Sequence, residues 1–293
     1  MFGPAYLRAA HPFGDPASLL ERQRAGFVLR FVPPGGTMLD LGCGDGSLTR
    51  RWAERARRVV AVDLSLDCLA LAVRRNAHPA IGYVCAPLEH VALGTRFDVV
   101  FLGEVVEHVF DAPALLRRAA GLLRPGGTVV LTTPNATSLA RRIAALPGLR
   151  QLYRRWRGRD PRAPVGHEHV AEYPLAALEA MLGDAGLRVV ARGGYGGLIP
   201  TFVERWLARV VPRDYILLTG ALAPRLAAHV WIAAHLDLSP RLPPRRADRE
   251  TRRHGAGTGT GSGHTGGHDE GSAKGTGVPS AVNSLGRREE WPR

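Results

Sequence analysis

The chain has few cysteines, no leader-like N-terminus and no long uninterrupted apolar run. Its three cysteines are scattered, with neither a pairing pattern nor a metal-ligand spacing, so we expect no disulfide, no metal site and a cytoplasmic location. The N-terminus lacks a basic segment followed by an apolar one, which argues against a signal peptide. A Pro-Arg pair and two histidines interrupt the apolar stretch 215–236, which excludes a membrane-spanning helix there.

Lysine is nearly absent as well, since Lys274 is the single example among 39 basic residues. The formal net charge is nevertheless +13, and part of this excess reflects the arginine-, alanine- and glycine-rich composition typical of a GC-rich genome. The rest is local, because segment 141–162 carries eight arginines and one acid, with Tyr153 and Trp156 among them. Such a cluster suits an anionic partner, and a solvated basic helix is the alternative.

Apolar runs and helical patterns alternate through the first part of the chain. This alternation predicts one α/β domain, 1–238, with a parallel sheet covered by helices on both faces. The segment 239–293 has too little apolar surface to offset its ordering entropy, which predicts a disordered tail. The expected strands are 37–41, 58–63, 81–85, 98–102, 128–132, 187–191 and 229–236, and the expected helices are 17–31, 46–56, 113–123, 174–185 and one that Ser65 caps and Asn76 ends.

The run 38–47, MLDLGCGDGS, passes from an apolar strand into a glycine turn and then into a helix, and a second apolar run ends at Asp63. This layout is typical of a nucleotide-like ligand, because glycines let the backbone approach and a carboxylate binds ribose hydroxyls. A dinucleotide site requires Gly-x-Gly-x-x-Gly, but Ser47 stands where the third glycine should be. Asp40 would face a cationic group well and a pyrophosphate badly, which favours S-adenosylmethionine.

The glycine run with Asp40, the strand that ends at Asp63, and segments 97–109 (FDVVFLGEVVEHV) and 123–131 (LRPGGTVVL) follow one another in this order. Together they resemble the motifs of class I S-adenosylmethionine-dependent methyltransferases. The Glu-x-x-Glu-His run in 97–109 is similar to that of the subgroup containing ubiquinone-biosynthesis O-methyltransferases. The resemblance covers about residues 20–236. It implies a Rossmann-like sheet of seven strands, mostly parallel, with a reversed last strand at one edge.

The resemblance also implies how the cofactor is held. Asp63 would bind both ribose hydroxyls, with helix capping as its alternative, and Asp40 would orient the ammonium group directly or through backbone amides. Arg24 would reach the methionine carboxylate or else stay solvated on its helix. Many relatives bind the adenine amino group with an acid that this chain lacks, so backbone and apolar contacts are expected there, with Glu89 as a late substitute. The expected cofactor-binding residues are Asp40, Gly42, Cys43, Gly44, Gly46, Asp63, Leu64, Ala86, Pro87, Leu88, Gly103 and Glu104.

His108 is the expected catalytic base, because imidazole titrates near neutrality and this residue follows the strand whose tip faces the methyl group in the family. Glu107 would orient His108 or cap the next helix, and an architectural role is the alternative for the pair. A second polar cluster, 167–169 with Tyr173, would line the acceptor pocket or begin a helix. The segment 134–173, which contains most of the arginine cluster, occupies the place of the family's acceptor lid.

The expected acceptor is an oxygen of a small molecule. Methyltransferases that act on bases or glutamine carry an Asn/Asp-Pro-Pro-aromatic motif after the fourth strand, whereas this chain reads LGEV at 102–105. The arginines favour an anionic acceptor, and the apolar residues near 210–218 leave room for a lipid-like acceptor or peripheral membrane contact. Nucleic acid is not expected, but an RNA- or protein-directed methyltransferase and a non-catalytic cofactor-binding module stay open as alternatives.

Overall fold

A computed structural model describes residues 19–144, 146, 169–198, 207, 209–210 and 219–237 of the chain. The chain divides into two units, Met1–Arg241 and Leu242–Arg293, and all the described residues belong to the first. The expected tail, 239–293, is outside the described residues, and so is the larger part of the expected lid, including Tyr153 and Trp156. The domain boundaries therefore stay predictions.

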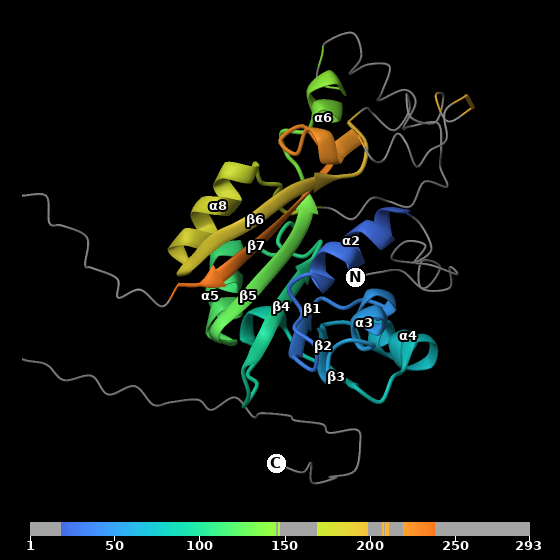
Figure 1. Cartoon of the computed structure of the whole chain (residues 1–293), viewed down its shortest axis with the longest axis vertical. Coiled ribbons are helices and arrows are strands. Elements are labelled where there is room, and N and C mark those ends of the chain that lie inside the picture. Colours follow the sequence, from blue (N-terminus) through green and yellow to red (C-terminus); the bar gives the residue numbers. More distant parts are fainter. Residues whose placement is uncertain are drawn as a thin grey trace, which may run out of the picture. The chain divides into compact units, whose positions relative to one another are not determined.

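One mixed sheet carries the domain, with strand order β3-β2-β1-β4-β5-β7-β6 (Figure 1). β7 is antiparallel to both of its neighbours, and the other neighbouring pairs are parallel. The central strands are continuous apolar runs because both faces of the sheet are covered. The strands are β1 (Thr37–Leu41), β2 (Arg58–Asp63), β3 (Ile81–Cys85), β4 (Phe97–Gly103), β5 (Leu123–Pro134), β6 (Leu187–Tyr195) and β7 (His229–Leu236).

The reversed last strand is confirmed, but its expected place at the edge of the sheet is wrong. β7 pairs with β5 on one side and with β6 on the other, so β6 is the edge strand. Burial explains the order, because Val230, Ile232, Ala233 and Ala234 of β7 are fully buried. β6, in contrast, is exposed or half-buried over most of its length.

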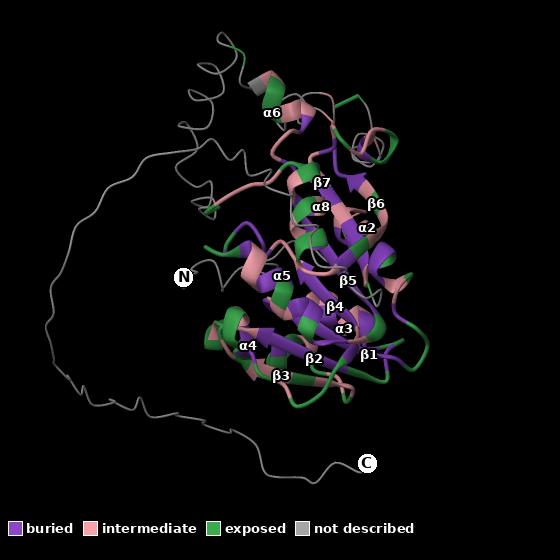
Figure 2. Cartoon of the chain, turned by 90° about the vertical axis from the view of Figure 1, so that its left-hand side faces the viewer, coloured by how far each residue is buried: buried purple, intermediate pink, exposed green. Residues whose placement is uncertain are grey.

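Helices cover both faces of the sheet, as expected. α2, α3 and α4 lie on one face and α5 and α8 on the other (Figure 1). Two clusters of buried apolar side chains fill the two interfaces, and Figure 2 shows the buried residues concentrated in the strands. The helices are α2 (Leu19–Leu29), α3 (Ser47–Trp52), α4 (Leu66–Asn76), α5 (Ala112–Gly121), α6 (Leu139–Ala144) and α8 (Leu175–Asp184), with a short 3-10 turn η1 (Leu88–His90).

Ser65 caps α4 as expected, since its Oγ accepts a hydrogen bond from the amide of Cys68 at 3.3 Å. The largest differences in length from the sequence expectation are in α3, which is shorter, and in β5 and β6, which are longer; the other expected elements begin and end within two residues of the expected positions. Among the described residues, no helix combines the length and the apolar composition that crossing a membrane requires.

The strand order brings the predicted site residues together at the carboxyl ends of the parallel strands. The chain runs from β1 outward to β3 on one side and from β4 to β5 on the other, so the order reverses between β1 and β4. In open α/β sheets, ligands bind in the crevice beyond the carboxyl ends of the strands at such a reversal. Gly42 follows β1, Asp63 ends β2 and Glu104 follows β4. The fold therefore brings three predicted site residues to one crevice.

Asp98 lies at the other end of the strands, near the start of β4, and its charge should contribute to the stability of the fold. Its Oδ2 accepts hydrogen bonds from the amide and the hydroxyl of Thr37, at 2.7 and 2.8 Å, and lies 2.9 Å from Arg124 Nη1. Burial alone would raise the pKa of Asp98, but these donors hold the pKa below its usual value. We expect Asp98→Asn to lower the free energy of unfolding near neutral pH by about 1–2 kcal/mol.

The pH dependence follows from the direction of that shift. A lowered pKa means that the carboxylate stabilises the fold above its unfolded-state value of about 3.9 and loses this contribution as the pH falls through the folded-state value. Urea unfolding of wild type and Asp98→Asn between neutral pH and pH values below about 4 should show the two proteins converging. A difference that stays constant with pH would contradict the electrostatic explanation.

Candidate functional site

The loop after β1 requires glycine at several positions. Gly42, Gly44 and Gly46 have φ of +82°, +55° and +73°, a left-handed region that L side chains rarely adopt. A Cβ added at Gly42 would lie 2.5 Å from Cγ2 of Val105, and one at Gly46 would lie 2.7 Å from the hydroxyl of Tyr83. Gly42 therefore lets this loop pack closely against Val105, just after β4, and Gly46 lets it pack against Tyr83 of β3.

Hydrogen bonds tie the glycine loop to Asp63. Gly44 N donates to Asp63 Oδ2 and Ser65 N donates to Asp63 Oδ1, both at 2.9 Å. The amides of Gly42 and Gly46 donate to the carbonyls of Val62 and Cys43, at 2.8 and 3.0 Å. These amides are thus satisfied within the protein, and the loop offers a ligand room for close approach. Asp63 is half-buried beside it, where ribose hydroxyls can reach the carboxylate.

The residues expected to contact adenine lie after β2 and β3. Leu64 is 66% exposed after β2, and the amide of Ala86 donates to the carbonyl of Asp63 at 3.1 Å. Leu88 Cδ1 lies 3.7 Å from the point where a Gly42 Cβ would stand. Pro87 and Glu89 are exposed, so neither is committed to the core.

Asp40 and Cys43 lie inside the fold. Asp40 is 2% exposed, and the hydroxyl of Thr49 on α3 donates to its Oδ2 at 2.5 Å. Burial raises the pKa of Asp40 to about 7, although the hydrogen bond from Thr49 opposes this. The carboxyl group thus braces β1 against α3, and its expected orientation of the ammonium group, directly or through backbone amides, stays a prediction. Burial also raises the pKa of the Cys43 thiol, as for an unreactive packing residue.

Glu104 is the centre of a polar network that the sequence did not reveal. It has φ of +54°, the only positive φ of a non-glycine residue in the described part of the chain. Its Oε1 accepts a hydrogen bond from the hydroxyl of Tyr195 at 2.8 Å, and its Oε2 lies 3.7 Å from Nε2 of His229. Burial would raise the pKa of Glu104, but Arg24, His229 and Tyr195 lower it below the usual range. Glu104 is therefore a held, ionised carboxylate.

Arg24 reaches the crevice from α2. Its Nη2 lies 3.5 Å from Glu104 Oε1 and its Nη1 lies 3.4 Å from Glu21 Oε2. Arg24 is 9% exposed, which rules out the alternative of a solvated helix arginine. Its Nε is buried without a hydrogen-bond partner among the described residues, which is unusual for a guanidinium.

Glu107 is fully buried in the turn that follows β4. Its Oε2 accepts a hydrogen bond from the hydroxyl of Thr133 at 2.9 Å. Burial, with the charge of Glu104 as the next cause, raises the pKa of Glu107 to about 8. The alternative of helix capping is excluded, because Asp111 caps α5 by accepting from the amide of Ala114.

His108 is exposed next to Glu107, and His169 joins it from the far end of the predicted lid. The two imidazole centroids lie 4.9 Å apart in an edge-to-face arrangement. His169 Nδ1 lies 2.5 Å from Glu172 Oε1, and Arg141 Nη2 is at the same distance from that oxygen. His167 and Glu168, the other members of this predicted cluster, lie outside the described residues. Among the described residues, Glu107, His108 and His169 are the group that could hold a metal ion.

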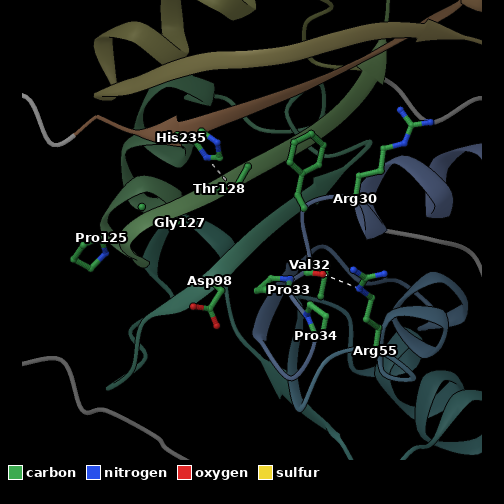
Figure 3. A pocket seen from close by; sticks show the side chains of 12 residues that line it. Arg30, Val32, Pro33, Pro34, Arg55, Asp98, Pro125, Gly127, Thr128 and His235 are labelled. Carbon is green, nitrogen blue, oxygen red and sulfur yellow. Dashed lines mark hydrogen bonds between the residues drawn. The ribbon is translucent and has the colours of Figure 1, made fainter.

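A cavity of about 450 Å³ lies at the amino-terminal ends of the parallel strands (Figure 3). It is lined by residues at the starts of β4 and β5 and at the end of β7, among them Asp98, Thr128 and His235. Thr128 Oγ1 and His235 Nδ1 lie 2.9 Å apart on its wall. Because the predicted cofactor residues lie at the carboxyl ends of the parallel strands, this cavity is not their site.

Comparisons with known proteins identify the family of the chain. A family model described as a methyltransferase domain matches residues 17–192, which is more than half of the chain. A ubiquinone biosynthesis O-methyltransferase of Bradyrhizobium sp. (strain ORS 278) is 42% identical over 103 residues, 34% of this chain and 41% of that protein. A malonyl-[acyl-carrier protein] O-methyltransferase of Serratia marcescens is 37% identical over 138 residues, 46% of this chain and 53% of that protein. The chain thus matches about half or less of the length of these relatives.

Among solved structures, the N-methyltransferase NodS from Bradyrhizobium japonicum WM9, in complex with S-adenosyl-L-homocysteine, is similar with a TM-score of 0.53. The similarity covers 79% of this chain and 95% of that one at 16% sequence identity. At this identity the likeness shows the fold alone.

Proposed function

The chain belongs to the methyltransferase domain family, and on this premise we propose that it uses S-adenosylmethionine as its cofactor and transfers the methyl group to an oxygen atom of a small molecule. The observation that carries the proposal is the group Glu107, His108 and His169, which stands beyond β4 beside Glu104. A hydroxyl must lose its proton when it is methylated, and an imidazole in this group can take it. The two relatives named above are both O-methyltransferases.

The residues present fit the cofactor. We infer that its ribose binds Asp63 and that its adenine lies against Leu64 and residues 86–88. Its amino-acid end then points across β1 toward Gly103 and β4. Arg24, whose Nε has no hydrogen-bond partner among the described residues, would hold the methionine carboxylate. Glu104 lies next to Arg24 and would face the positively charged ammonium and sulfonium groups of the cofactor. A Cβ at Gly103 would lie 2.5 Å from the ring of Phe101, so this position has room for glycine only.

The chemistry then divides between alignment and proton removal. When bound, the cofactor supplies a methyl group on a positively charged sulfur. The protein must align the acceptor oxygen in line with that methyl group and exclude other geometries. We assign proton removal to His108, because Glu107, with a pKa of about 8, keeps its own proton near neutral pH. Glu107 instead lies next to His108, where its Oε2 accepts a hydrogen bond from the hydroxyl of Thr133.

An anionic acceptor is the finer form of the proposal. Arg141, which contacts Glu172 close to His169, is the part of the arginine cluster that the described residues bring to the site. Guanidinium groups bind carboxylates and phosphates in two-point contacts. The other arginines of 150–162 lie outside the described residues, so their contribution rests on the sequence alone.

Incubation of the protein with methyl-labelled cofactor and cell extract tests the proposal. We expect label in the small-molecule fraction, on oxygen by mass spectrometry. His108→Ala should lower turnover by about 100-fold, as for loss of a general base, while leaving the affinity for S-adenosylhomocysteine unchanged. Label in RNA or protein, or cofactor binding without any product, would overturn the small-molecule assignment. Wild-type turnover by His108→Ala would remove His108 as the base.

A further inference from the structure

We propose that Tyr195 positions the Glu104 carboxylate beside the positively charged end of the cofactor, and that the site thereby selects S-adenosylmethionine over S-adenosylhomocysteine. The inference rests on the proposed function, in which Arg24 holds the methionine carboxylate and Glu104 faces the ammonium and sulfonium groups. S-adenosylmethionine carries a positive sulfonium, whereas the sulfur of S-adenosylhomocysteine is neutral. A fixed negative charge near the sulfur therefore favours the methyl donor over the product that remains after transfer.

The two carboxylate oxygens of Glu104 have different surroundings. Oε1 accepts the hydrogen bond from the Tyr195 hydroxyl at 2.8 Å and lies 3.5 Å from Nη2 of Arg24. Oε2 lies 3.7 Å from Nε2 of His229, which is longer than a hydrogen bond, so this oxygen can accept one from a ligand. The side chain of Glu104 is 21% exposed, whereas Tyr195 is 2% exposed. A ligand can therefore reach Glu104, and Tyr195 acts on that ligand only through the carboxylate.

The backbone of Glu104 needs support to keep this orientation. Its φ of +54° lies in the left-handed region, where a residue with a side chain persists only if its surroundings enforce the conformation. Its amide donates to the carbonyl of Thr132 on β5 at 2.9 Å, which holds the main chain. The hydrogen bond from Tyr195 holds the side chain. Without that hydroxyl, we expect the carboxylate to turn toward Arg24 and to compete there with the methionine carboxylate.

The ring of Tyr195 is fixed by its neighbours. Tyr195 lies at the end of β6, opposite His229 of β7 in the antiparallel register. Its ring stacks on that of His229 with centroids 5.0 Å apart and packs against Phe27 of α2 at 5.6 Å. Gly194, directly before Tyr195, packs closely as well, since an added Cβ would lie 2.5 Å from Cβ of Ala227. A ring that packs against two aromatic neighbours holds its hydroxyl in one place.

The charges of Arg24 and Glu104 match those of an amino-acid group. Although burial alone would raise the pKa of Glu104, the groups around it lower the pKa below its usual value, so the side chain is a carboxylate near neutral pH. Arg24 is a permanent cation, and its buried Nε has no hydrogen-bond partner among the described residues. Arg24 thus suits the carboxylate of the ligand, and Glu104 suits its ammonium group. The sulfonium is the remaining charge, and of the two ligands only the methyl donor carries it.

Calorimetry of the full chain with three ligands tests the inference. S-adenosylmethionine and S-adenosylhomocysteine differ in the sulfonium charge, and 5′-methylthioadenosine lacks the amino-acid end. We expect the ratio of the S-adenosylhomocysteine to the S-adenosylmethionine dissociation constant to fall by about 3–10-fold in Tyr195→Phe, because Glu104 loses a hydrogen bond. The same ratio should fall by about 10-fold or more in Glu104→Gln, which removes the charge itself. Both variants should bind 5′-methylthioadenosine like wild type, which shows that the fold and the nucleoside contacts are intact.

A double variant shows whether Tyr195 acts through Glu104. Adding Tyr195→Phe to Glu104→Gln should change the ratio no further, because the charge that Tyr195 positions is already gone. Trp231→Phe is the matched control, since Trp231 stacks on Phe27 at 5.0 Å within the same group of aromatic side chains. This control should lose thermal stability and keep the wild-type ratio.

A wild-type ratio in Tyr195→Phe, or an undiminished effect of Tyr195→Phe in the double variant, would overturn the positioning role. An equal fall of the ratio in Trp231→Phe would assign the effect to packing and overturn it too, and this comparison keeps the test decisive if Glu104→Gln does not fold. These outcomes leave the proposed function standing. Failure of the wild-type protein to bind S-adenosylmethionine and S-adenosylhomocysteine would instead overturn the proposed function, and this inference with it.

Discussion

Asp63→Ala is expected to lower the affinity for S-adenosylhomocysteine by on the order of 100-fold, because two hydrogen bonds from ribose hydroxyls to a charged carboxylate contribute about 3 kcal/mol together. The substitution also removes the acceptor for the amides of Gly44 and Ser65, so the glycine loop loses one of its supports. Isothermal titration calorimetry of the purified variant measures the affinity directly.

Two further variants separate the ribose contact from the support of the loop. Asp63→Asn keeps an acceptor for a backbone amide but loses the charge, and it should therefore show most of the loss of affinity with little loss of thermal stability. Asp67→Ala removes an exposed acid in the first turn of α4 and should bind like wild type. An unchanged affinity in Asp63→Ala would mean that the ribose binds elsewhere.

Much of the fold follows from local patterns in the sequence. The bounds of β1, β2, β3 and β7 are as expected, because each is an apolar run between turn-forming residues. β5 is longer than expected since its partners extend it: it pairs with β4 from Leu123 and with β7 as far as Pro134. The place of β7 between β5 and β6 depends on which strand buries both faces, and local periodicity does not report that.

The same distinction between local pattern and tertiary pairing holds for the site residues. The glycine loop and Asp63 are readable because their residues are close in sequence and carry a recognisable spacing. Tyr195 and His229 escaped the sequence analysis, because they reach Glu104 only after β6 and β7 have paired. The two glycines before Tyr195 were the only hint in the sequence that the chain packs closely at this point. In the structure, a Cβ at Gly193 or Gly194 would lie within 2.5 Å of a neighbouring atom. Glu172 likewise gains its meaning from His169 and Arg141.

Gly42→Ala is expected to lower the affinity for S-adenosylhomocysteine by at least about 100-fold and to destabilise the protein by about 1–2 kcal/mol from the left-handed backbone alone. Gly42 has φ of +82°, and its new Cβ would stand 2.5 Å from Cγ2 of Val105, which is itself buried. The loop or β4 must therefore shift, and either movement closes the crevice where we place the cofactor.

The chain offers a matched control for the backbone effect. Gly35 has φ of +69° but no atom within 4 Å of its added Cβ, so Gly35→Ala has the strain without the clash. It should lose stability and keep wild-type affinity, whereas Gly42→Ala loses both. The double variant Gly42→Ala with Val105→Ala removes the clashing methyl group and should recover part of the affinity. Calorimetry and thermal unfolding of the four proteins decide the matter, and wild-type affinity in Gly42→Ala would show that the cofactor does not depend on this close approach.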